Sequence, residues 1–260
     1  MASPSPASIS LTKAYDRVDD MTRTGVVIFA RMGSSRLPGK SLTDLCGRPV
    51  LGEMIDRMTH LSSPARIIVA TSDLPGDDAI SEFCRTDATC RDLGVEVFRG
   101  PHLDVLGRAA ACAAHFGLDP LVRVSGDSPF MDPAVIDRVL SRHAETSPDI
   151  TTNRFPPTFP PGITVEALSG NCLARLDETA TDPEDREHVT TFIYKNPEAF
   201  SIVNVSASRP GLRTTPLTLD TPEDLALARA LKVRLVERGN PLDHLSTVDL
   251  RNELTASTAE

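Results

Sequence analysis

Short β-branched runs alternate with longer helical patterns through the first half of the chain, and this alternation limits the fold more than any other feature. Short apolar runs bounded by turn residues are typical of buried strands. They lie at 26–29, 67–70, 95–98 and 121–124. Helical patterns fill the gaps at 50–60, 77–91, 105–116 and 133–144. The last pattern begins with Asp132 as its N-cap and Pro133 as its first helical residue. This alternation predicts an α/β protein whose mostly parallel sheet carries helices on both faces.

The second half of the chain departs from this alternation. Residues 150–205 contain Pro-rich turns, an extended piece at 163–168 and a charged helix at 183–196. We interpret this region as a small β-rich arm or lid. The chain then returns with an expected strand at 216–219 and a long helix at 222–237, whose apolar residues recur at helical spacing.

Composition limits the class of protein. A chain of 260 residues suits one core, so we expect a single domain over residues 24–260, after a disordered tail over 1–23 that is rich in Ala, Ser and Pro. The net charge of −9 disfavours nucleic acid and anionic membranes as partners. No apolar run is long enough to span a bilayer. The five cysteines form no CxxC pair or zinc-ligand spacing, which is typical of a reduced, cytoplasmic protein.

The loop after the first expected strand combines small residues with three cations. Its sequence, ARMGSSRLPGK over residues 30–40, lets backbone N–H groups approach an anion closely. Arginine suits bidentate phosphate contact, and lysine supplies a compact charge. The three cations are Arg31, Arg36 and Lys40. The loop matches neither a Walker A loop nor a GxGxxG motif. Because ligands of open α/β sheets bind beyond the carboxyl ends of the strands, we expect this loop to bind a polyphosphate.

Two aspartates follow expected strands in similar settings. Asp127 lies in VRVSGDSP after the strand at 121–124, and Asp220 lies in TLDTPEDL at the end of the strand at 216–219. One or two carboxylates, completed by phosphate oxygens and waters, are the ligands that Mg²⁺ prefers. The residues alone leave other roles open. Asp220 could cap the following helix together with Thr221, and Asp127 could form an Asx turn.

The loop and both aspartate segments resemble those of the cytidylyltransferases that activate sugar acids, the CMP-ketodeoxyoctonate and CMP-sialate synthetase group. ARMGSSRLPGK is similar to their nucleotide loop, and SGDSP and LDTPEDL are similar to their metal-binding segments. FRG at 98–100, DVLGR at 104–108 and DREHV at 185–189 resemble the spore-coat polysaccharide F-like branch. The resemblance covers residues 25–237 and implies a Rossmann-like sheet of the nucleotide-diphospho-sugar transferase type.

The resemblance also implies an activity: Mg²⁺-dependent transfer of CMP from CTP to a sugar acid or similar anionic acceptor, with release of pyrophosphate. It assigns catalysis to Arg31, Lys40, Asp127 and Asp220, and it assigns Mg²⁺ to the two aspartates. The implied nucleotide-binding residues are Ala30, Met32, Gly33, Ser34, Arg36, Thr71, Ser72, Gly100, Asp104, Arg108, Ser125 and Gly126.

The acceptor side of the chain matches this family less closely. Candidate acceptor-binding residues are Arg154, Glu166, Arg186 and His188. A solvated charged helix or a dimer contact would explain the last two equally well. Pro161 and Thr164 stand where the resembled segment has aspartates, so the acceptor stays open. A phosphonate or polyol-phosphate acceptor is one alternative, and a non-catalytic nucleotide-binding homologue is another. The family further implies a homodimer formed through the arm.

Overall fold

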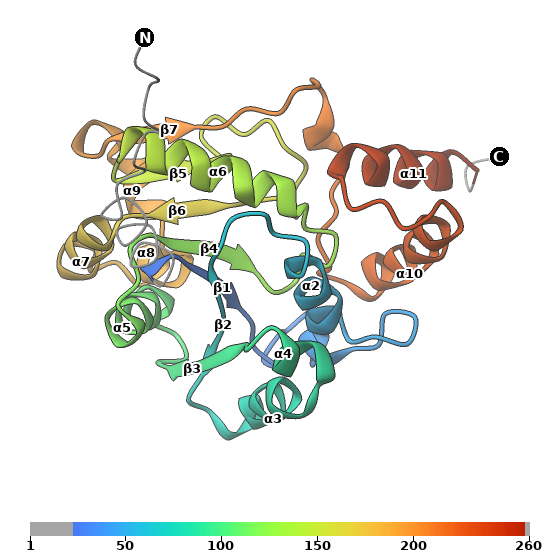
Figure 1. Cartoon of the computed structure of the whole chain (residues 1–260), viewed down its shortest axis with the longest axis horizontal. Helices are drawn as coiled ribbons and strands as arrows, with labels where there is room; N and C mark the ends of the chain where they lie inside the picture. The colour runs from blue at the N-terminus through green and yellow to red at the C-terminus, as the bar shows by residue number, and fades with distance from the viewer. Residues whose placement is uncertain (1–22, 258–260) are drawn as a thin grey trace, which may run out of the picture.

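A seven-stranded sheet forms the centre of the computed structural model, which describes residues 23–257 (Figure 1). The strands follow the order β3-β2-β1-β4-β6-β5-β7. They are β1 (Gly25–Phe29), β2 (Arg66–Ser72), β3 (Glu96–Gly100), β4 (Leu121–Ser125), β5 (Ile150–Thr152), β6 (Glu166–Leu168) and β7 (Ile202–Asn204). Among these strands, β6 runs antiparallel to β4 and β5, and the other pairs are parallel. The prediction of a mostly parallel sheet is confirmed. The tail expected over 1–23 lies outside the described residues, except for Arg23.

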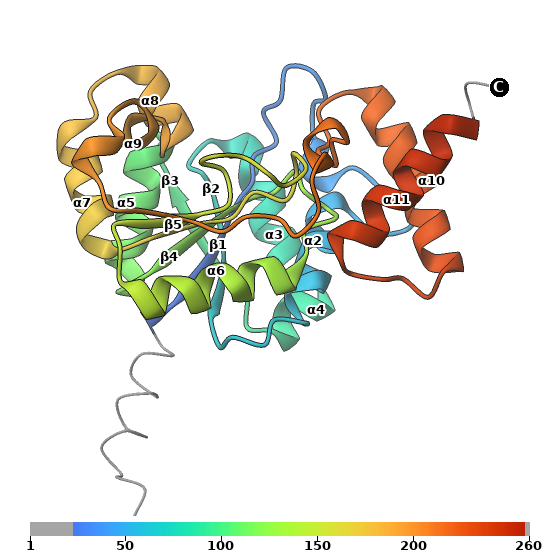
Figure 2. The ribbon, with the colours of Figure 1, turned by 90° about the horizontal axis from the view of Figure 1, so that it is seen from above.

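Helices cover both faces of the sheet. They are α2 (Val50–Met58), α3 (Asp78–Thr86), α4 (Ala88–Asp92), α5 (Val105–Phe116), α6 (Pro133–Thr146), α7 (Gly170–Thr179), α8 (Pro183–His188), α9 (Thr191–Lys195), α10 (Pro222–Glu237) and α11 (His244–Ser257). The views in Figures 1 and 2 place α7, α8 and α9 at one end of the molecule and α10 and α11 at the other. No described helix is long and apolar enough to cross a membrane.

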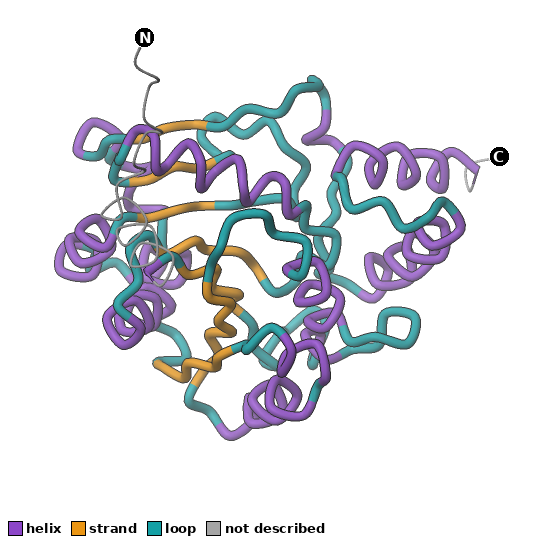
Figure 3. Tube along the Cα trace, in the orientation of Figure 1, coloured by secondary structure: helices purple, strands orange, loops and turns teal. Residues whose placement is uncertain are grey.

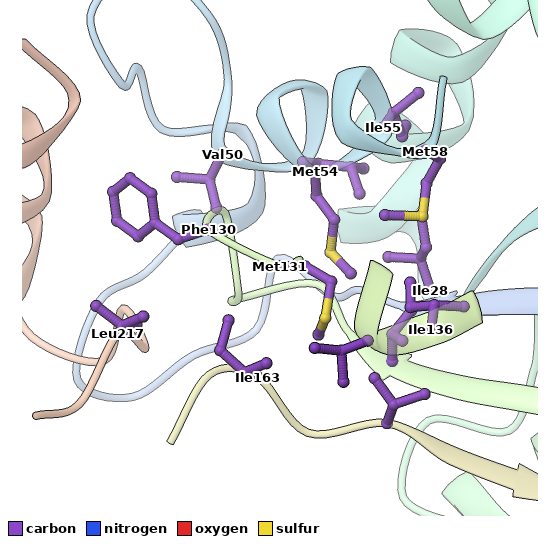
Figure 4. Packing of buried hydrophobic residues seen from close by; sticks show 14 of the residues in the cluster. Ile28, Val50, Met54, Ile55, Met58, Phe130, Met131, Ile136, Ile163 and Leu217 are labelled. Carbon is purple, nitrogen blue, oxygen red and sulfur yellow. The ribbon is translucent and has the colours of Figure 1, made fainter. Parts of the chain in front are cut away.

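Alternate residues of the central strands enter two separate apolar cores. Val26 and Ile28 of β1 pack into the core that contains residues of α2 and α6, whereas Val27 packs into the core formed with α5 and α7. In the first core, Met54 of α2 and Met131 extend toward the sheet (Figure 4). Each of these side chains is fully buried, and such burial contributes about 1.5–3 kcal/mol per residue. The sheet is therefore packed against an apolar core on each face.

Three helices begin where the sequence predicts, because a side chain caps each first turn. Asp104 accepts the N–H of Gly107 and starts α5, and Asp132 accepts the N–H of Ala134 and starts α6. Thr221 starts α10 through a reciprocal capping box. Thr221, and not Asp220, is therefore the cap of α10, which leaves the Asp220 carboxylate available for other contacts.

Two predicted helices are each broken into two. The helix expected at 77–91 ends at Thr86, because Asp87 adopts an extended conformation and its side chain caps α4 at Cys90. The helix expected at 183–196 is interrupted at Val189, which has φ 60° and ψ −59°. There the N–H of Thr190 donates to the carbonyl of His188 at 2.7 Å. This γ-turn is strained for a β-branched residue.

The prediction of a strand at 216–219 is wrong. That segment has no regular secondary structure and pairs with no strand among the described residues. The N–H of Leu217 instead donates to the carbonyl of Pro161 at 2.7 Å, and the N–H of Leu219 donates to the carbonyl of Asp127 at 3.1 Å. These two backbone hydrogen bonds connect residues 216–219 to two loops and fix the backbone just before Asp220. The sequence also did not predict β5, β7, α7 or α11 as separate elements.

The connections that carry the candidate residues meet at one edge of the sheet. Because β6 is reversed, its first residue, Glu166, is paired with Arg123 of β4 and with Thr152 at the carboxyl end of β5. The segments 30–40, 126–132 and 153–165 therefore leave the sheet on the same side. Figure 3 shows loops gathered there, between the strands and the helices α10 and α11.

Candidate active site

Lys40 lies between the two predicted metal-binding aspartates. Its Nζ atom donates to Oδ2 of Asp127 at 2.7 Å and to Oδ1 of Asp220 at 3.2 Å. A third bond, of 3.2 Å, reaches the carbonyl of Leu219. These contacts use the three donors of an ammonium group. The structure therefore brings together one residue from the cationic loop and two carboxylates that are far apart in the sequence.

Asp127 is held in its ionised form by these neighbours. Burial acts to raise the pKa of its carboxyl group, but the Lys40 ammonium and a hydrogen bond from Ser125 outweigh this effect. Oγ of Ser125 lies 2.6 Å from Oδ1 of Asp127. The pKa of Asp127 consequently falls below its ordinary value. At neutral pH the site presents a carboxylate rather than a carboxylic acid.

The cationic loop is closed by its own backbone. The N–H of Gly39 donates to the carbonyl of Met32 at 3.0 Å, and the N–H of Leu37 donates to Oγ of Ser34 at 3.3 Å. Gly39 has φ 72°, a conformation that glycine adopts without strain. Gly33 is exposed at the loop surface. This closed turn directs Lys40 inward and leaves the small residues open to solvent.

The two arginines of the loop make exposed ion pairs. Arg36 contacts Asp220 at 3.0 Å, with 64% of its side chain exposed. Arg31 contacts Glu187 of α8 at 3.2 Å, while Oγ of Ser41 holds the Arg31 carbonyl at 3.0 Å. Surface pairs of this kind contribute about 0–1 kcal/mol. An incoming phosphate can therefore replace either carboxylate at low cost.

Gly126 brings the ends of β1 and β4 into close contact. Its N–H donates to the carbonyl of Phe29 at 2.9 Å. A Cβ atom at position 126 would lie 2.9 Å from both the Phe29 carbonyl oxygen and the Cβ of Ala30, so a larger residue does not fit without movement. Ala30 is buried and donates its N–H to the carbonyl of Ala70 at 3.2 Å. This close approach places Asp127 beside the cationic loop.

Asp77 is a site residue that the sequence analysis missed. Its buried carboxylate accepts the N–H of Met32 at 2.7 Å and the N–H of Ser72 at 3.1 Å, and it also accepts the Ser72 hydroxyl. Burial acts to raise the pKa of Asp77, but these hydrogen bonds lower it below its ordinary value. Asp77 thus joins the cationic loop to the end of β2. An aspartate that starts a helical pattern gives no hint of such a distant partner.

The predicted nucleoside-binding residues lie at the ends of β2 and β3. Thr71 and Ser72 are fully buried. Gly100 lies beside Arg108, because a Cβ atom on Gly100 would be 3.0 Å from Cγ of Arg108. Arg108 is 2% exposed. This group lies over different strands from Lys40 and Asp127, although at the same edge of the sheet.

Asp104 and Arg186 pair with each other. Nη2 of Arg186 contacts Asp104 at 2.7 Å and Asp177 at 2.6 Å. Nη1 donates to the carbonyls of Asp177 and Ala180, and Nε donates to Asp104 at 2.8 Å. Each nitrogen of the Arg186 guanidinium therefore has a partner. This arrangement joins α5, α7 and α8, and it engages Arg186 in structural contacts rather than leaving it free for an acceptor.

Arg154 and Glu166 meet through Tyr194. The Tyr194 hydroxyl donates to Glu166 at 2.6 Å, and the Arg154 guanidinium lies over the Tyr194 ring at 5.9 Å. Glu166 is fully buried and also pairs with Arg123 at 2.6 Å, so its carboxylate does not reach solvent. His188 is exposed at the end of α8. Of the four candidate acceptor residues, Arg154 and His188 are thus the exposed ones.

The donor set fits a divalent cation that takes few protein ligands. The described residues contain no cluster of three or more His, Cys, Asp or Glu side chains that could hold a metal. They do contain two carboxylates, Asp127 and Asp220, within hydrogen-bond distance of a single ammonium group. Mg²⁺ is commonly bound by one or two carboxylates, with substrate phosphates and waters as further ligands. The site matches this requirement.

The order of the strands and the helical layers place the chain among α/β proteins with a nucleotidyltransferase-like fold. Among solved structures it is similar to a cytidylyltransferase from Leptospira borgpetersenii, with a TM-score of 0.82 and 26% sequence identity. The match covers 90% of this chain and 96% of that one.

The chain belongs to the cytidylyltransferase family, whose model matches residues 26–246. It is 31% identical over 221 residues to the spore coat polysaccharide biosynthesis protein SpsF of Bacillus subtilis, covering 82% of this chain and 87% of that protein. It is 35% identical over 184 residues to the 3-deoxy-manno-octulosonate cytidylyltransferase of Chromohalobacter salexigens, covering 66% of each chain. The protein is therefore a nucleotidyl-transferring enzyme of the class that uses CTP, which confirms the family predicted from the sequence.

Proposed function

We propose that the protein transfers CMP from CTP to a small anionic acceptor, such as a sugar acid, with Mg²⁺ as cofactor and pyrophosphate as the leaving group. This proposal rests on one observation: Asp127 and Asp220 both contact Lys40, the last residue of the cationic loop at 30–40. The 3-deoxy-manno-octulosonate cytidylyltransferase among its relatives supports a sugar acid as the acceptor class.

In this proposal the cationic loop binds the triphosphate. Backbone N–H groups around Gly33 and Ser34, with Arg36 and Lys40, face the β- and γ-phosphates and neutralise the charge that develops on pyrophosphate as it leaves. An acceptor oxygen attacks the α-phosphorus in line with the leaving group, so no covalent enzyme intermediate is needed. When bound to Asp127 and Asp220, Mg²⁺ would supply further charge neutralisation at the phosphate oxygens.

A pyrophosphate-release assay tests this proposal. We expect pyrophosphate release with CTP and a sugar acid. Release with a phosphonate or a polyol phosphate in place of a sugar acid would indicate the alternative acceptor class. Lys40→Ala should lower turnover by roughly two to three orders of magnitude, as does removal of one preorganised charge donor in other enzymes.

Lys232→Ala is the matched control. Lys232 has 14% of its side chain exposed and pairs with Glu53 at 2.7 Å, whereas Lys40 has 15% exposed and pairs with Asp127 at 2.7 Å. Lys232 lies on α10 and faces Glu53 of α2, outside the site. If Lys40→Ala and Lys232→Ala lose turnover equally, the catalytic assignment of Lys40 is wrong.

A cytoplasmic homodimer remains part of the proposal. Residues 150–205, expected from the sequence to form an arm, contribute β5, β6 and β7 to the central sheet. They also carry the exposed side chains of Arg154 and His188, which a second protomer or an acceptor could each contact. Light scattering of the full chain, with and without CTP, gives its oligomeric state directly.

A further inference from the structure

A groove of about 580 Å³ lies between α5 and α7, two helices that Figures 1 and 2 show side by side. None of the described residues that line it is one of the implied nucleotide-binding residues. Small side chains, several of them exposed, form its walls. They include Ala110, Ala111 and Ala114 of α5, and Gly170, Asn171 and Ala174 of α7. Because the distance between packed helices depends on the side chains at the contact, a further helix can pack closely there.

The described part of the chain begins at one end of this groove. Arg23 lines the groove and is helical. Its carbonyl accepts the N–H of Asp119 at 2.8 Å, and its guanidinium pairs with the Asp119 carboxylate at 3.2 Å. Asp119 lies in the connection that leads from α5 to β4. Since consecutive Cα atoms are about 3.8 Å apart, the chain before Arg23 starts from this end of the groove.

The segment that precedes Arg23 has the sequence pattern of an amphipathic helix. Residues 11–22 contain no Gly, Pro or Ser. Their apolar residues recur at the spacing i, i+3, i+4, i+7 and i+10, and every other residue of the segment is polar. These apolar residues are Leu11, Ala14, Tyr15, Val18 and Met21. Within the expected tail, the composition rich in Ala, Ser and Pro therefore belongs to residues 1–10.

The length of this segment matches that of the groove. On α5 the groove extends from Gly107 to the C-cap Gly117, which is about 15 Å at the helical rise per residue. A helix over residues 11–21 has the same length of about 15 Å. A short connection would then lead into β1, just as the connection after α5 leads into β4, the parallel neighbour of β1. The segment would thus run parallel to α5 along the whole groove.

We propose that residues 11–22 bind as a helix in the groove between α5 and α7 of the same chain, with their apolar face toward the alanines. Because the segment is tethered at Arg23, its effective concentration at the groove is high, and a weak contact is enough to hold it. Docking of this kind is what orders a chain terminus. The bound segment covers the solvent-facing side of α5. This inference does not depend on the proposed function.

Hydrogen–deuterium exchange of the full chain, followed by mass spectrometry, tests this inference. Amides of residues 11–21 should exchange at least about tenfold more slowly than those of an unstructured peptide. Ala111→Gln combined with Ala174→Gln fills the groove with longer side chains and should remove this protection. The matched control combines Ala144→Gln with Ala226→Gln, which change exposed alanines of α6 and α10, and should keep it.

Substitutions in the segment give an independent readout. Val18→Ser, on the apolar face, should remove the protection, whereas Asp19→Ser, on the polar face, should keep it. The chain contains no Trp, so Tyr15→Trp introduces a single indole. Its emission should lie at shorter wavelength than that of free indole and resist quenching by acrylamide. Filling the groove should reverse both properties.

The inference is overturned if residues 11–21 exchange at the rate of an unstructured peptide. It is also overturned if their protection survives the substitutions that fill the groove, because the segment would then be held elsewhere. Protection that rises with protein concentration would assign the groove to the segment of a second copy and would overturn binding within one chain. None of these readouts needs CTP or turnover, so a failed transferase assay does not decide them.

Discussion

Replacing Lys40 with methionine should change stability, metal response and turnover together. The substitution removes two ion-paired hydrogen bonds, to Asp127 at 2.7 Å and to Asp220 at 3.2 Å. Hydrogen bonds to charged groups contribute about 1.5–3 kcal/mol each. Lys40, Asp127 and Asp220 are 15%, 21% and 31% exposed, so the lower end of this range applies. Lys40→Met should therefore lower the free energy of unfolding at pH 7 by roughly 2–3 kcal/mol.

The pH dependence of this loss follows from the direction of the Asp127 pKa. Because the folded-state pKa of Asp127 is lowered, its contribution is present above the unfolded-state pKa of about 3.9 and is lost as the pH falls through the folded-state value. The difference between wild type and Lys40→Met should thus be full at pH 7 and shrink below about pH 4. Urea denaturation across this range measures it. An equal difference at pH 7 and at pH 3 would refute the reasoning.

The same variant tests the metal site without an activity measurement. Without the ammonium group, Asp127 and Asp220 lose the cation that both contact, and a divalent cation can take its place. Mg²⁺ or Mn²⁺ should therefore raise the melting temperature of Lys40→Met more than that of the wild type. Lys232→Met, which leaves Glu53 without its partner on α10, should lose stability without this metal response. Equal metal responses in the two variants would remove the basis for the metal site.

Three further substitutions test other parts of the site. Asp77→Asn should lower the free energy of unfolding by about 1–3 kcal/mol and raise the KM for CTP, because Asp77 holds the N–H of Met32; an unchanged KM would show that Asp77 does not position the loop. Glu187→Gln should leave stability within about 1 kcal/mol and strengthen CTP binding by about two- to fivefold at low salt, because it frees Arg31. Calorimetry at low and high salt checks this, and weaker binding would contradict it. Gly162→Ala should cost about 2 kcal/mol or more in urea denaturation, because Gly162 has φ 97° and a Cβ atom would lie 2.7 Å from the backbone carbonyl carbon of Leu217. Gly76→Ala, where a Cβ atom meets nothing within 4 Å, is its control, and equal losses would contradict the argument.

Features set by local sequence could be predicted well. The starts of α5, α6 and α10 depend on Asp104, Asp132 and Thr221, each of which caps a backbone N–H two or three residues away. The alternation of strands and helices likewise follows from apolar patterns that lie within single segments. These interactions need no knowledge of the rest of the fold.

Features set by distant partners could not be predicted. The sequence pattern around Arg186 is typical of an exposed charged helix. In the structure, however, its guanidinium group forms ion pairs with Asp104 and Asp177. Glu166 reads as a candidate ligand for an acceptor, yet it is buried against Arg123 and Tyr194. The sequence around a charged residue does not indicate which distant residues the fold will place beside it. The family resemblance supplied the pairing of the loop with the two aspartates, which local patterns could not.

The reversal of β6 has a consequence for how such an enzyme can change its acceptor. Because β5 and β6 run in opposite directions, the connection 153–165 both leaves and re-enters the sheet at the edge where the nucleotide is expected to lie. Its exposed side chains at 154–157 can be exchanged without shifting β1 to β4, whereas Pro161 and Gly162 are packed against the segment just before Asp220. We expect an exchange of residues 154–157 between relatives to alter the proposed acceptor side while the residues proposed to bind CTP keep their positions.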